Sequence, residues 1–209
     1  MSLITIPVDA QFIILERTEN YTDRNEINSG GFAQTQFVRR ERKHTVDSGW
    51  SVANFNAAIA TANAIWEPAE IRFRASEPTT RCVQPPMDFT YATDGAYQYL
   101  MNHTVGQDGR ITVLLVQKFP HWDQGGDAGR GTCIVPSMMN GLDPGRVLAH
   151  EFGHLLGLEH VETDEESMQN LMRQDSVAGS ELTDEQIARA RQSGLAQRAI
   201  PPSDEENES

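Results

Sequence analysis

The hydrophobic positions of the chain follow two different periods, and the change of period predicts a fold of mixed helices and strands. Residues 11–16 form a short apolar run of strand length, and residues 71–74 alternate between apolar and charged side chains, as in a half-buried strand. Residues 111–116 are apolar at nearly every position, which predicts a central strand buried on both faces. Residues 50–66 have apolar side chains at helical spacing, namely Val52, Phe55, Ile59, Ala62 and Trp66. We therefore expect a long helix that packs on a sheet.

A polar segment follows the first predicted strand. Residues 17–34 are polar and contain the turn signal Asn28-Ser29-Gly30-Gly31, and a second strand-like stretch covers about residues 35–46. The two strands are expected to pair, which predicts a hairpin-like insertion over about residues 17–46. The second strand carries a basic cluster in an acidic protein, consisting of Arg39, Arg40, Arg42 and Lys43. Such a cluster is typical of a solvated edge strand. Contact with a partner or a propeptide is the alternative that stays open.

The candidate chemistry lies between His150 and His160, where the chain reads H-E-x-x-H-x-x-G-x-x-H. On a helix, His150 and His154 present their imidazoles on one face to one metal ion, and Glu151 projects beside them toward a metal-bound water. A continuous helix would place His160 about 15 Å along the axis from His150, so the chain must turn back. Gly157 can adopt the positive φ that ends the helix there. Three histidines with an open fourth position are the pattern of a catalytic zinc site.

This long motif resembles the zinc-binding signature of the metzincin metallopeptidases. The resemblance implies that a methionine in a tight turn, the Met-turn, packs beneath the histidines. Met172, in Asn170-Leu171-Met172, is the candidate, and Met168 is the reserve. The resemblance also implies an antiparallel edge strand along the cleft, where an extended peptide adds as a further strand, formed by Thr132, Cys133, Ile134 and Val135. Pro136 at its end suits an edge because proline cannot donate to a ladder.

Capping signals bound the two helices that follow. Asp143 and Pro144 predict the start of the motif helix, which should run to about residue 156. Gly153 within it costs up to about 1 kcal/mol relative to alanine, so we expect a close neighbour or a functional reason. Thr183 and Gln186 form a capping box at the start of a last helix that should end near residue 194.

The resemblance implies an α+β, zincin-like fold with a twisted mixed sheet of about five strands, a backing helix and an active-site helix. A small C-terminal subdomain should contain the Met-turn and the terminal helix. We expect one catalytic domain over residues 1–201, divided into an N-terminal subdomain to about residue 157 and a C-terminal subdomain over 158–201. Residues 202–209 look like a disordered acidic tail.

The implied activity is zinc-dependent hydrolysis of peptide bonds by an endopeptidase. Zinc held by His150, His154 and His160 lowers the pKa of bound water and polarises the scissile carbonyl, and Glu151 transfers the water proton to the leaving amine. A zinc hydrolase of a non-peptide amide and a toxin-like binding module with the protease fold remain as alternatives. An additional structural Ca²⁺ or Zn²⁺ is compatible with the loop over residues 119–131, but its spacing is not diagnostic.

Composition and charge limit the classes of partner that we expect the protein to bind. The chain has 17 Lys and Arg against 30 Asp and Glu, a net charge of −13, which argues against nucleic acid as a partner. The protein or peptide substrate is what the resemblance to the metzincins implies. No run approaches the ~20 apolar residues of a membrane span. The amino terminus lacks the basic region of a signal peptide, so we expect a cytoplasmic protein or export by a signal-independent route. The sequence does not decide whether Cys82 and Cys133 form a disulfide, and it leaves the oligomeric state open.

Overall fold

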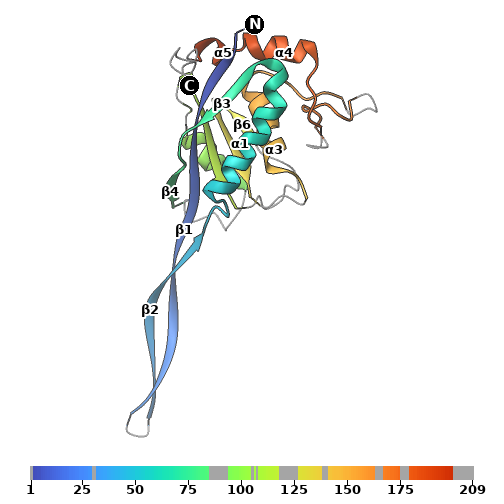
Figure 1. Ribbon diagram of the computed structural model, residues 1–209. Helices are drawn as coiled ribbons and strands as arrows, with labels where there is room; N and C mark the ends of the chain where they lie inside the picture. The colour runs from blue at the N-terminus through green and yellow to red at the C-terminus, as the bar shows by residue number, and fades with distance from the viewer. Residues whose placement is uncertain are drawn as a thin grey trace.

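The computed structural model describes residues 2–29, 32–84, 94–104, 106, 108–117, 127–137, 141–162, 167–174 and 179–199. Their strands form one seven-stranded mixed sheet, and helices cover both of its faces. A long two-stranded hairpin leaves this body at one end (Figure 1). The α+β class and the mixed sheet are confirmed. The tail over 202–209 lies outside the described residues.

Strand β1 (Ile4–Ser29) organises the sheet. On one side it pairs in parallel with β3 (Ile71–Ala75) and then β4 (Thr79–Val83). On the other side it pairs in parallel with β5 (Ile111–Val116), which is buried along its whole length as its apolar run predicts. Strand β7 (Thr132–Pro136) lies parallel to β5, and β6 (Asp127–Gly129) pairs antiparallel with β7. The sheet exceeds five strands because β1 alone has four partners.

The prediction that Thr132, Cys133, Ile134 and Val135 form an antiparallel edge strand is wrong. These residues belong to β7, which is parallel to β5 and has β6 on its other side. The antiparallel outermost strand is β6. Arg130 and Gly131 both have positive φ, 52° and 75°, so a tight turn folds β6 back onto β7. Pro136 lies at the end of β7, beyond the residues that pair with β6.

The helices predicted over residues 50–66 and 144–156 lie close to their expected bounds. Helix α1 (Val52–Trp66) is followed by the short 3-10 helix η1 (Glu67–Ala69), and α2 (Asp94–His103) lies on the other face of the sheet. Helix α3 (Pro144–Leu155) starts at the Asp143 cap, whose carboxylate accepts the backbone N–H groups of residues 145 and 146 at 2.7 and 3.3 Å. The predicted last helix is α4 (Asp184–Gln192), which ends close to the expected residue 194, and a short helix that the sequence did not predict, α5 (Gly194–Arg198), begins at the Ser193 cap.

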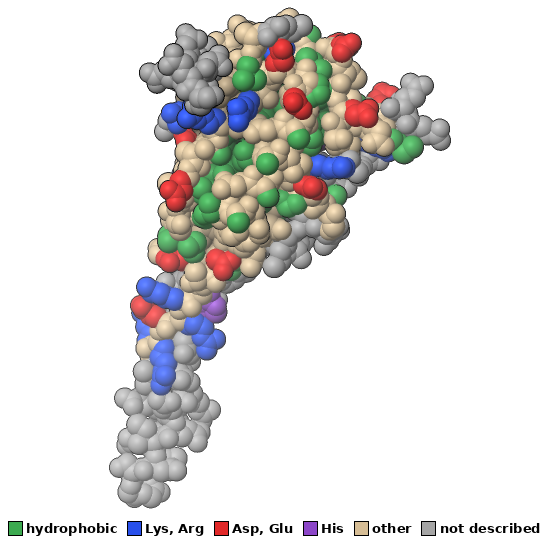
Figure 2. Space-filling view, in the orientation of Figure 1, with side chains coloured by type: hydrophobic (Ala, Val, Ile, Leu, Met, Phe, Trp, Pro, Cys, Tyr) green, Lys and Arg blue, Asp and Glu red, His purple; other side chains and the backbone are tan. Residues whose placement is uncertain are grey.

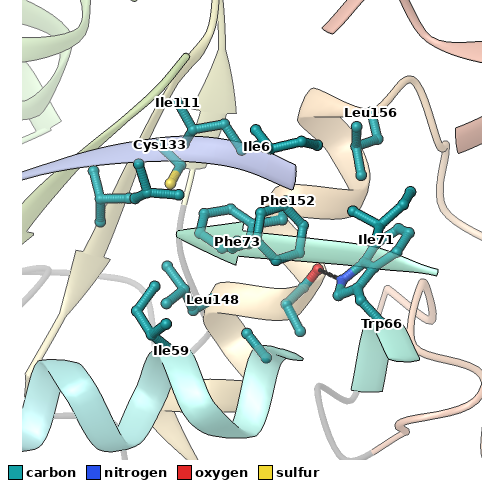
Figure 3. Close-up of a cluster of buried hydrophobic side chains, with 14 of the residues drawn as sticks. Ile6, Ile59, Trp66, Ile71, Phe73, Ile111, Cys133, Leu148, Phe152 and Leu156 are labelled. Carbon is teal, nitrogen blue, oxygen red and sulfur yellow. Dashed lines mark hydrogen bonds between the residues drawn. The ribbon is translucent and has the colours of Figure 1, made fainter. Parts of the chain in front are cut away.

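The main core lies between the sheet and the pair α1 and α3 (Figure 3). Phe73 of β3 contacts both Trp66 of α1 and Phe152 of α3, with ring centroids 6.0 and 4.2 Å apart. The Trp66 indole N–H donates to the carbonyl oxygen of Ala149 at 3.1 Å, so α1 holds the motif helix by a buried hydrogen bond as well as by packing. A Cβ on Gly145 would lie 2.4 Å from Thr61 Cβ, and this close helix crossing therefore requires glycine.

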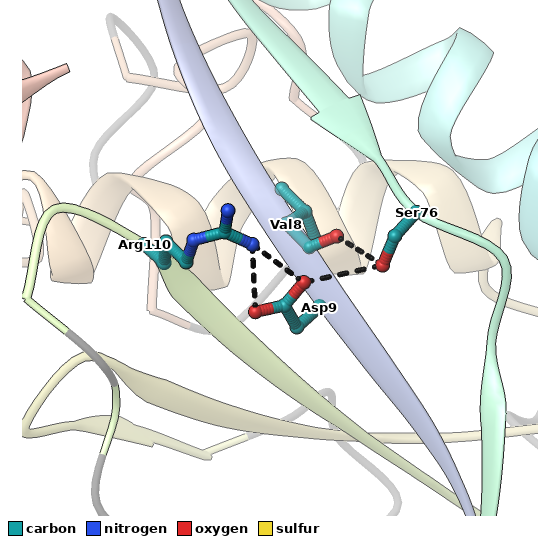
Figure 4. Close-up of polar contacts among 4 residues, drawn as sticks. All are labelled: Val8, Asp9, Ser76 and Arg110. Atoms are coloured by element: carbon teal, nitrogen blue, oxygen red, sulfur yellow. Dashed lines mark hydrogen bonds and ion pairs between the residues drawn. The ribbon is translucent and has the colours of Figure 1, made fainter. Parts of the chain in front are cut away.

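A polar contact joins β1 to both neighbours where β3 ends and β5 begins (Figure 4). The Arg110 guanidinium donates to both carboxylate oxygens of Asp9 at 3.0 and 3.2 Å. The Ser76 hydroxyl contacts Asp9 Oδ1 at 3.2 Å and the Val8 carbonyl oxygen at 3.3 Å. Because Arg110 and Asp9 are partly exposed, the ion pair contributes little stability.

The hairpin formed by β1 and β2 (Phe32–Val46) extends beyond the body as an arm. From the Glu16–Thr45 pair to the Ser29–Phe32 pair, the two strands pair with each other alone within the described residues. At ~3.3 Å per residue the arm is about 45 Å long. Arg39, Arg40, Arg42 and Lys43 are exposed near its base (Figure 2). The sequence predicted the pairing but gave residues 17–34 as a polar segment, since strands that leave the body need no apolar alternation.

Candidate metal centre

Helix α3 ends in a turn that brings the third histidine back toward the first two. The N–H of Gly157 donates to the carbonyl oxygen of His154 at 3.0 Å, and the N–H of Leu158 donates to that of Gly153 at 2.9 Å. These two bonds form a Schellman motif with Gly157 in the left-handed region at φ +83°. No other atom lies within 4 Å of a Cβ built on Gly157, so backbone conformation alone explains this glycine.

The three motif histidines converge. The Nε2 atoms of His150, His154 and His160 lie 3.0 to 3.2 Å from one another. In tetrahedral zinc coordination with Zn–N distances of about 2.0–2.1 Å, ligand nitrogens lie about 3.3 Å apart. The observed triangle therefore fits three ligands of one zinc ion. Within the described ranges, these three residues are the one group of three or more His, Cys, Asp or Glu side chains placed to hold a metal.

Hydrogen bonds on the far side of two rings fix which nitrogen faces the centre. His150 Nδ1 lies 2.7 Å from the carbonyl oxygen of Leu171, and His154 Nδ1 lies 3.0 Å from that of Leu158. A carbonyl only accepts, so each Nδ1 donates its hydrogen. In the neutral rings the Nε2 lone pairs then point into the triangle, where a metal ion satisfies them together.

Burial keeps the histidines in the form that binds metal. Burial is the main reason that the pKa of His150 is lowered to about 4, and the charges of His154 and His160 lower it further, while the hydrogen bond to Leu171 acts in the opposite direction. The pKa of His160 is also lowered from 6.5, first by burial and then by the charge of His154. Both rings are therefore neutral at pH 7, as metal ligation requires.

Glu151 follows His150 in α3 and is 3 % exposed. Its neighbour toward the C-terminus, Phe152, is fully buried in the core, so the helix presents His150 and Glu151 from a firmly packed segment. The carboxylate belongs to the same turn of helix as the first histidine.

Met172 lies in a tight turn beneath the motif helix. It is fully buried, and a Cβ on Gly153 would lie 2.4 Å from its sulfur, which explains the glycine inside α3. The N–H of Val161 donates to the Met172 carbonyl oxygen at 2.9 Å, so the turn also holds the residue after His160. Met168, the reserve candidate, is 55 % exposed.

The other residues that the sequence singled out are not members of the histidine group or lie outside the described residues. Thr132, Cys133, Ile134 and Val135 are buried in β7, and the Trp50 indole N–H donates to the Val135 carbonyl oxygen at 3.2 Å. Cys82 is exposed in β4 and Cys133 is buried in β7, and no disulfide joins them. Residues 118–126, which carry most of the loop considered for a second metal, are outside the described residues.

Sequence reasoning missed two residues that hold the turn around Met172. The side chains of Asn170 and Gln186 hydrogen-bond to each other across the gap between the turn and α4. Gln186 was recognised as part of a capping box, and that role is present. Its second contact had no local signal, because the partner lies 16 residues earlier in the chain.

Comparison with known families gives one match. The family model described as matrixin matches residues 42–192, which include α1, α3, α4 and the whole stretch from His150 to His160. Most of the arm precedes the matched segment. No curated protein matches the chain closely enough to count as a relative. In the part of the chain that the structure describes, none of the helices has the length and apolar character needed to cross a membrane.

Proposed function

The chain belongs to the matrixin family of zinc metallopeptidases, and from that premise we propose that Glu151 is the general base of a zinc endopeptidase. His150, His154 and His160 hold the zinc ion in this proposal. When bound, zinc lowers the pKa of its water and polarises a carbonyl oxygen. Glu151 accepts the proton of the attacking water and delivers it to the leaving amine.

The convergence of three Nε2 atoms at 3.0 to 3.2 Å is the observation that supports the ligand set most directly. Three lone pairs directed at one point repel one another unless a cation lies between them. The carbonyl groups that fix His150 and His154 keep the rings from turning away. Rings held in this way favour metal affinity, because little side-chain ordering remains to be done on binding.

The substrates are peptides or proteins, as for a peptidase of this family. We place an extended substrate along the outer side of β6, the outermost strand, which contacts α3. A strand added there would gain main-chain hydrogen bonds from a ready-made edge. We also propose a single catalytic domain over residues 1–201, in which residues 158–201 supply the third histidine and the Met-turn. No observation favours a non-peptide amidase or a binding module.

The test is a digest of a peptide library by zinc-loaded protein beside the Glu151→Gln variant. Gln keeps the size of the side chain but accepts no proton at neutral pH, so we expect a fall in kcat of at least about a hundredfold with zinc still bound. Glu159→Gln is the matched control, because that carboxylate is exposed and forms a surface ion pair with Arg189 at 3.4 Å. Equal cleavage by the parent and by Glu151→Gln would overturn the assigned role.

A further inference from the structure

We propose that Asn170 and Gln186 form an amide lock that positions the zinc ligand His150 through the backbone of the Met-turn. The lock is defined as the reciprocal pair of hydrogen bonds between these two side chains. Asn170 Nδ2 donates to Gln186 Oε1 at 3.0 Å, and Gln186 Nε2 donates to Asn170 Oδ1 at 3.1 Å. The inference rests on the proposed ligand set and adds two positioning residues to it.

Backbone donors fix the orientation of both amides. The N–H of Met172 donates to Asn170 Oδ1 at 2.8 Å, so this oxygen cannot exchange places with Nδ2 without setting two donors against each other. The N–H of Thr183 likewise donates to Gln186 Oε1 at 2.9 Å. Each amide oxygen therefore accepts two hydrogen bonds, one from the backbone and one from the other amide. The pair has a single arrangement that satisfies all four contacts.

The lock acts on His150 through Leu171, the residue between Asn170 and Met172. The carbonyl oxygen of Leu171 accepts the 2.7 Å hydrogen bond from His150 Nδ1. Along the chain, that carbonyl lies between two restrained groups. One is the Asn170 side chain, and the other is the Met172 N–H, which donates to the Asn170 side chain. The N–H of Leu171 donates to the Glu181 carbonyl oxygen at 2.8 Å, which holds the other side of the same residue. Restraining the turn thus restrains the ring nitrogen that faces the metal.

The same turn reaches the third histidine. Its Met172 carbonyl oxygen accepts the N–H of Val161, the residue after His160. A Met-turn displaced from α4 would shift the partner of His150 and the backbone beside His160 together. The Nε2 triangle would then widen. The lock consequently couples the docking of α4 to metal affinity.

Gln186 has two separable roles, and this makes the proposal testable. Its Oε1 accepts the Thr183 N–H in the capping box of α4, while its Nε2 donates to Asn170. Gln186→Glu keeps an acceptor for the cap but replaces the donor with a carboxylate oxygen that faces Asn170 Oδ1. Thr183→Ala does the reverse. It removes the hydroxyl that accepts the backbone N–H of Gln186 at 3.2 Å, and it leaves the lock intact.

The experiment measures zinc affinity by competition with a chelator, with zinc alone as the probe, for the full chain and both variants. We expect Gln186→Glu to weaken zinc binding about 10- to 100-fold, as for other residues that orient metal ligands, and Thr183→Ala to change it less than threefold. Asn170→Ala and Gln186→Ala should each weaken zinc binding to a similar extent. The double variant that combines them should lose no more zinc affinity than the single variant with the larger loss.

The chemical shifts of the His150 ring nitrogens in the zinc-free protein report the tautomer of the ring. A loss of stability alone does not change this second readout. We expect the Nδ1–H tautomer in the parent and in Thr183→Ala, and a mixture of tautomers in Gln186→Glu. Unchanged affinity and tautomer in Gln186→Glu would overturn the lock while leaving the ligand set in place. A parent chain that binds zinc without using His150 would instead overturn the proposed function.

Discussion

Around α3, side chains bond to the backbone of distant segments, Trp66 to Ala149 and His150 to Leu171. The arm differs, because beyond the pair of Leu15 and Val46 its two strands pair with each other alone within the described residues. Both regions extend from the same sheet. The contrast shows that the metal centre depends on tertiary contacts from several elements, whereas the arm depends on β1 and β2 alone. Changes to the first should disturb function, and changes to the second should not.

The largest expected effect follows from removing a ligand. His154→Ala deletes one Nε2 from the triangle and should lower zinc affinity by more than about a hundredfold, since losing a direct ligand exceeds the cost of losing its support. Peptide cleavage should fall in parallel. Chelator competition and a cleavage assay at saturating zinc measure the two quantities. His103→Gln, which changes a histidine of α2 on the other face of the sheet, is the control and should bind zinc normally.

The zinc-free protein should lose stability in acid through His150. Its folded-state pKa is lowered to about 4, chiefly by burial, so the unfolded chain binds the proton first as the pH falls below about 6.5. Unfolding free energy should therefore decrease between about pH 6.5 and pH 4, by on the order of 2–3 kcal/mol from this group. Urea titrations at several pH values measure it. A His150→Gln variant with the same pH dependence would contradict the assignment.

Two glycines of the metal centre should respond differently to alanine. Gly153→Ala places a Cβ 2.4 Å from the Met172 sulfur, so overpacking by roughly 1–3 kcal/mol should outweigh the ~1 kcal/mol gain in helix propensity. Gly157→Ala meets no atom within 4 Å but keeps φ at +83°, which costs roughly 1–2 kcal/mol of backbone strain. Thermal unfolding compares both with the parent. Adding Met172→Ala should remove the overpacking of the Gly153→Ala variant and so recover part of its lost stability. The same addition should recover none of the stability that Gly157→Ala loses.

The smallest effect should come from shortening the arm. Arg17 and His44 are register partners, so joining them through Asn-Gly replaces residues 18–43 with a two-residue hairpin turn. Zinc affinity and cleavage of a short peptide should remain within about twofold, because the metal centre receives its contacts from α1, α4 and the Met-turn. A chain that no longer folds or binds zinc after this change would show that the two regions are not independent.

Local signals were enough to predict the helices of the metal centre. Asp143 caps α3 and Thr183 caps α4 through contacts within three residues, and Gly157 ends α3 through its own backbone conformation. The long motif and the resemblance that it carries led to the zinc metallopeptidase class, which the family match confirms. Such signals can be read from a sequence because the interacting groups are near neighbours in the chain.

The parts that were missed depend on contacts between distant residues or on very short elements. Strand β6 has three residues and no apolar alternation, so the sequence did not reveal it and predicted β7 as the edge strand. Strand β4 went unrecognised because its exposed residues gain their partner only when β1 passes beside them. The lock between Asn170 and Gln186 spans 16 residues, and only the folded chain brings its two amides together.

The continuity of β1 from Ile4 to Ser29 has a mechanical consequence. The strand that forms half of the arm is the one that β3, β4 and β5 hold inside the body. Tension along the arm would load those three ladders in shear, with many hydrogen bonds sharing the force at once, while β2 would bear on one ladder only. The arm is therefore anchored in the body through three ladders of β1, and a pull on its β1 strand is shared among them.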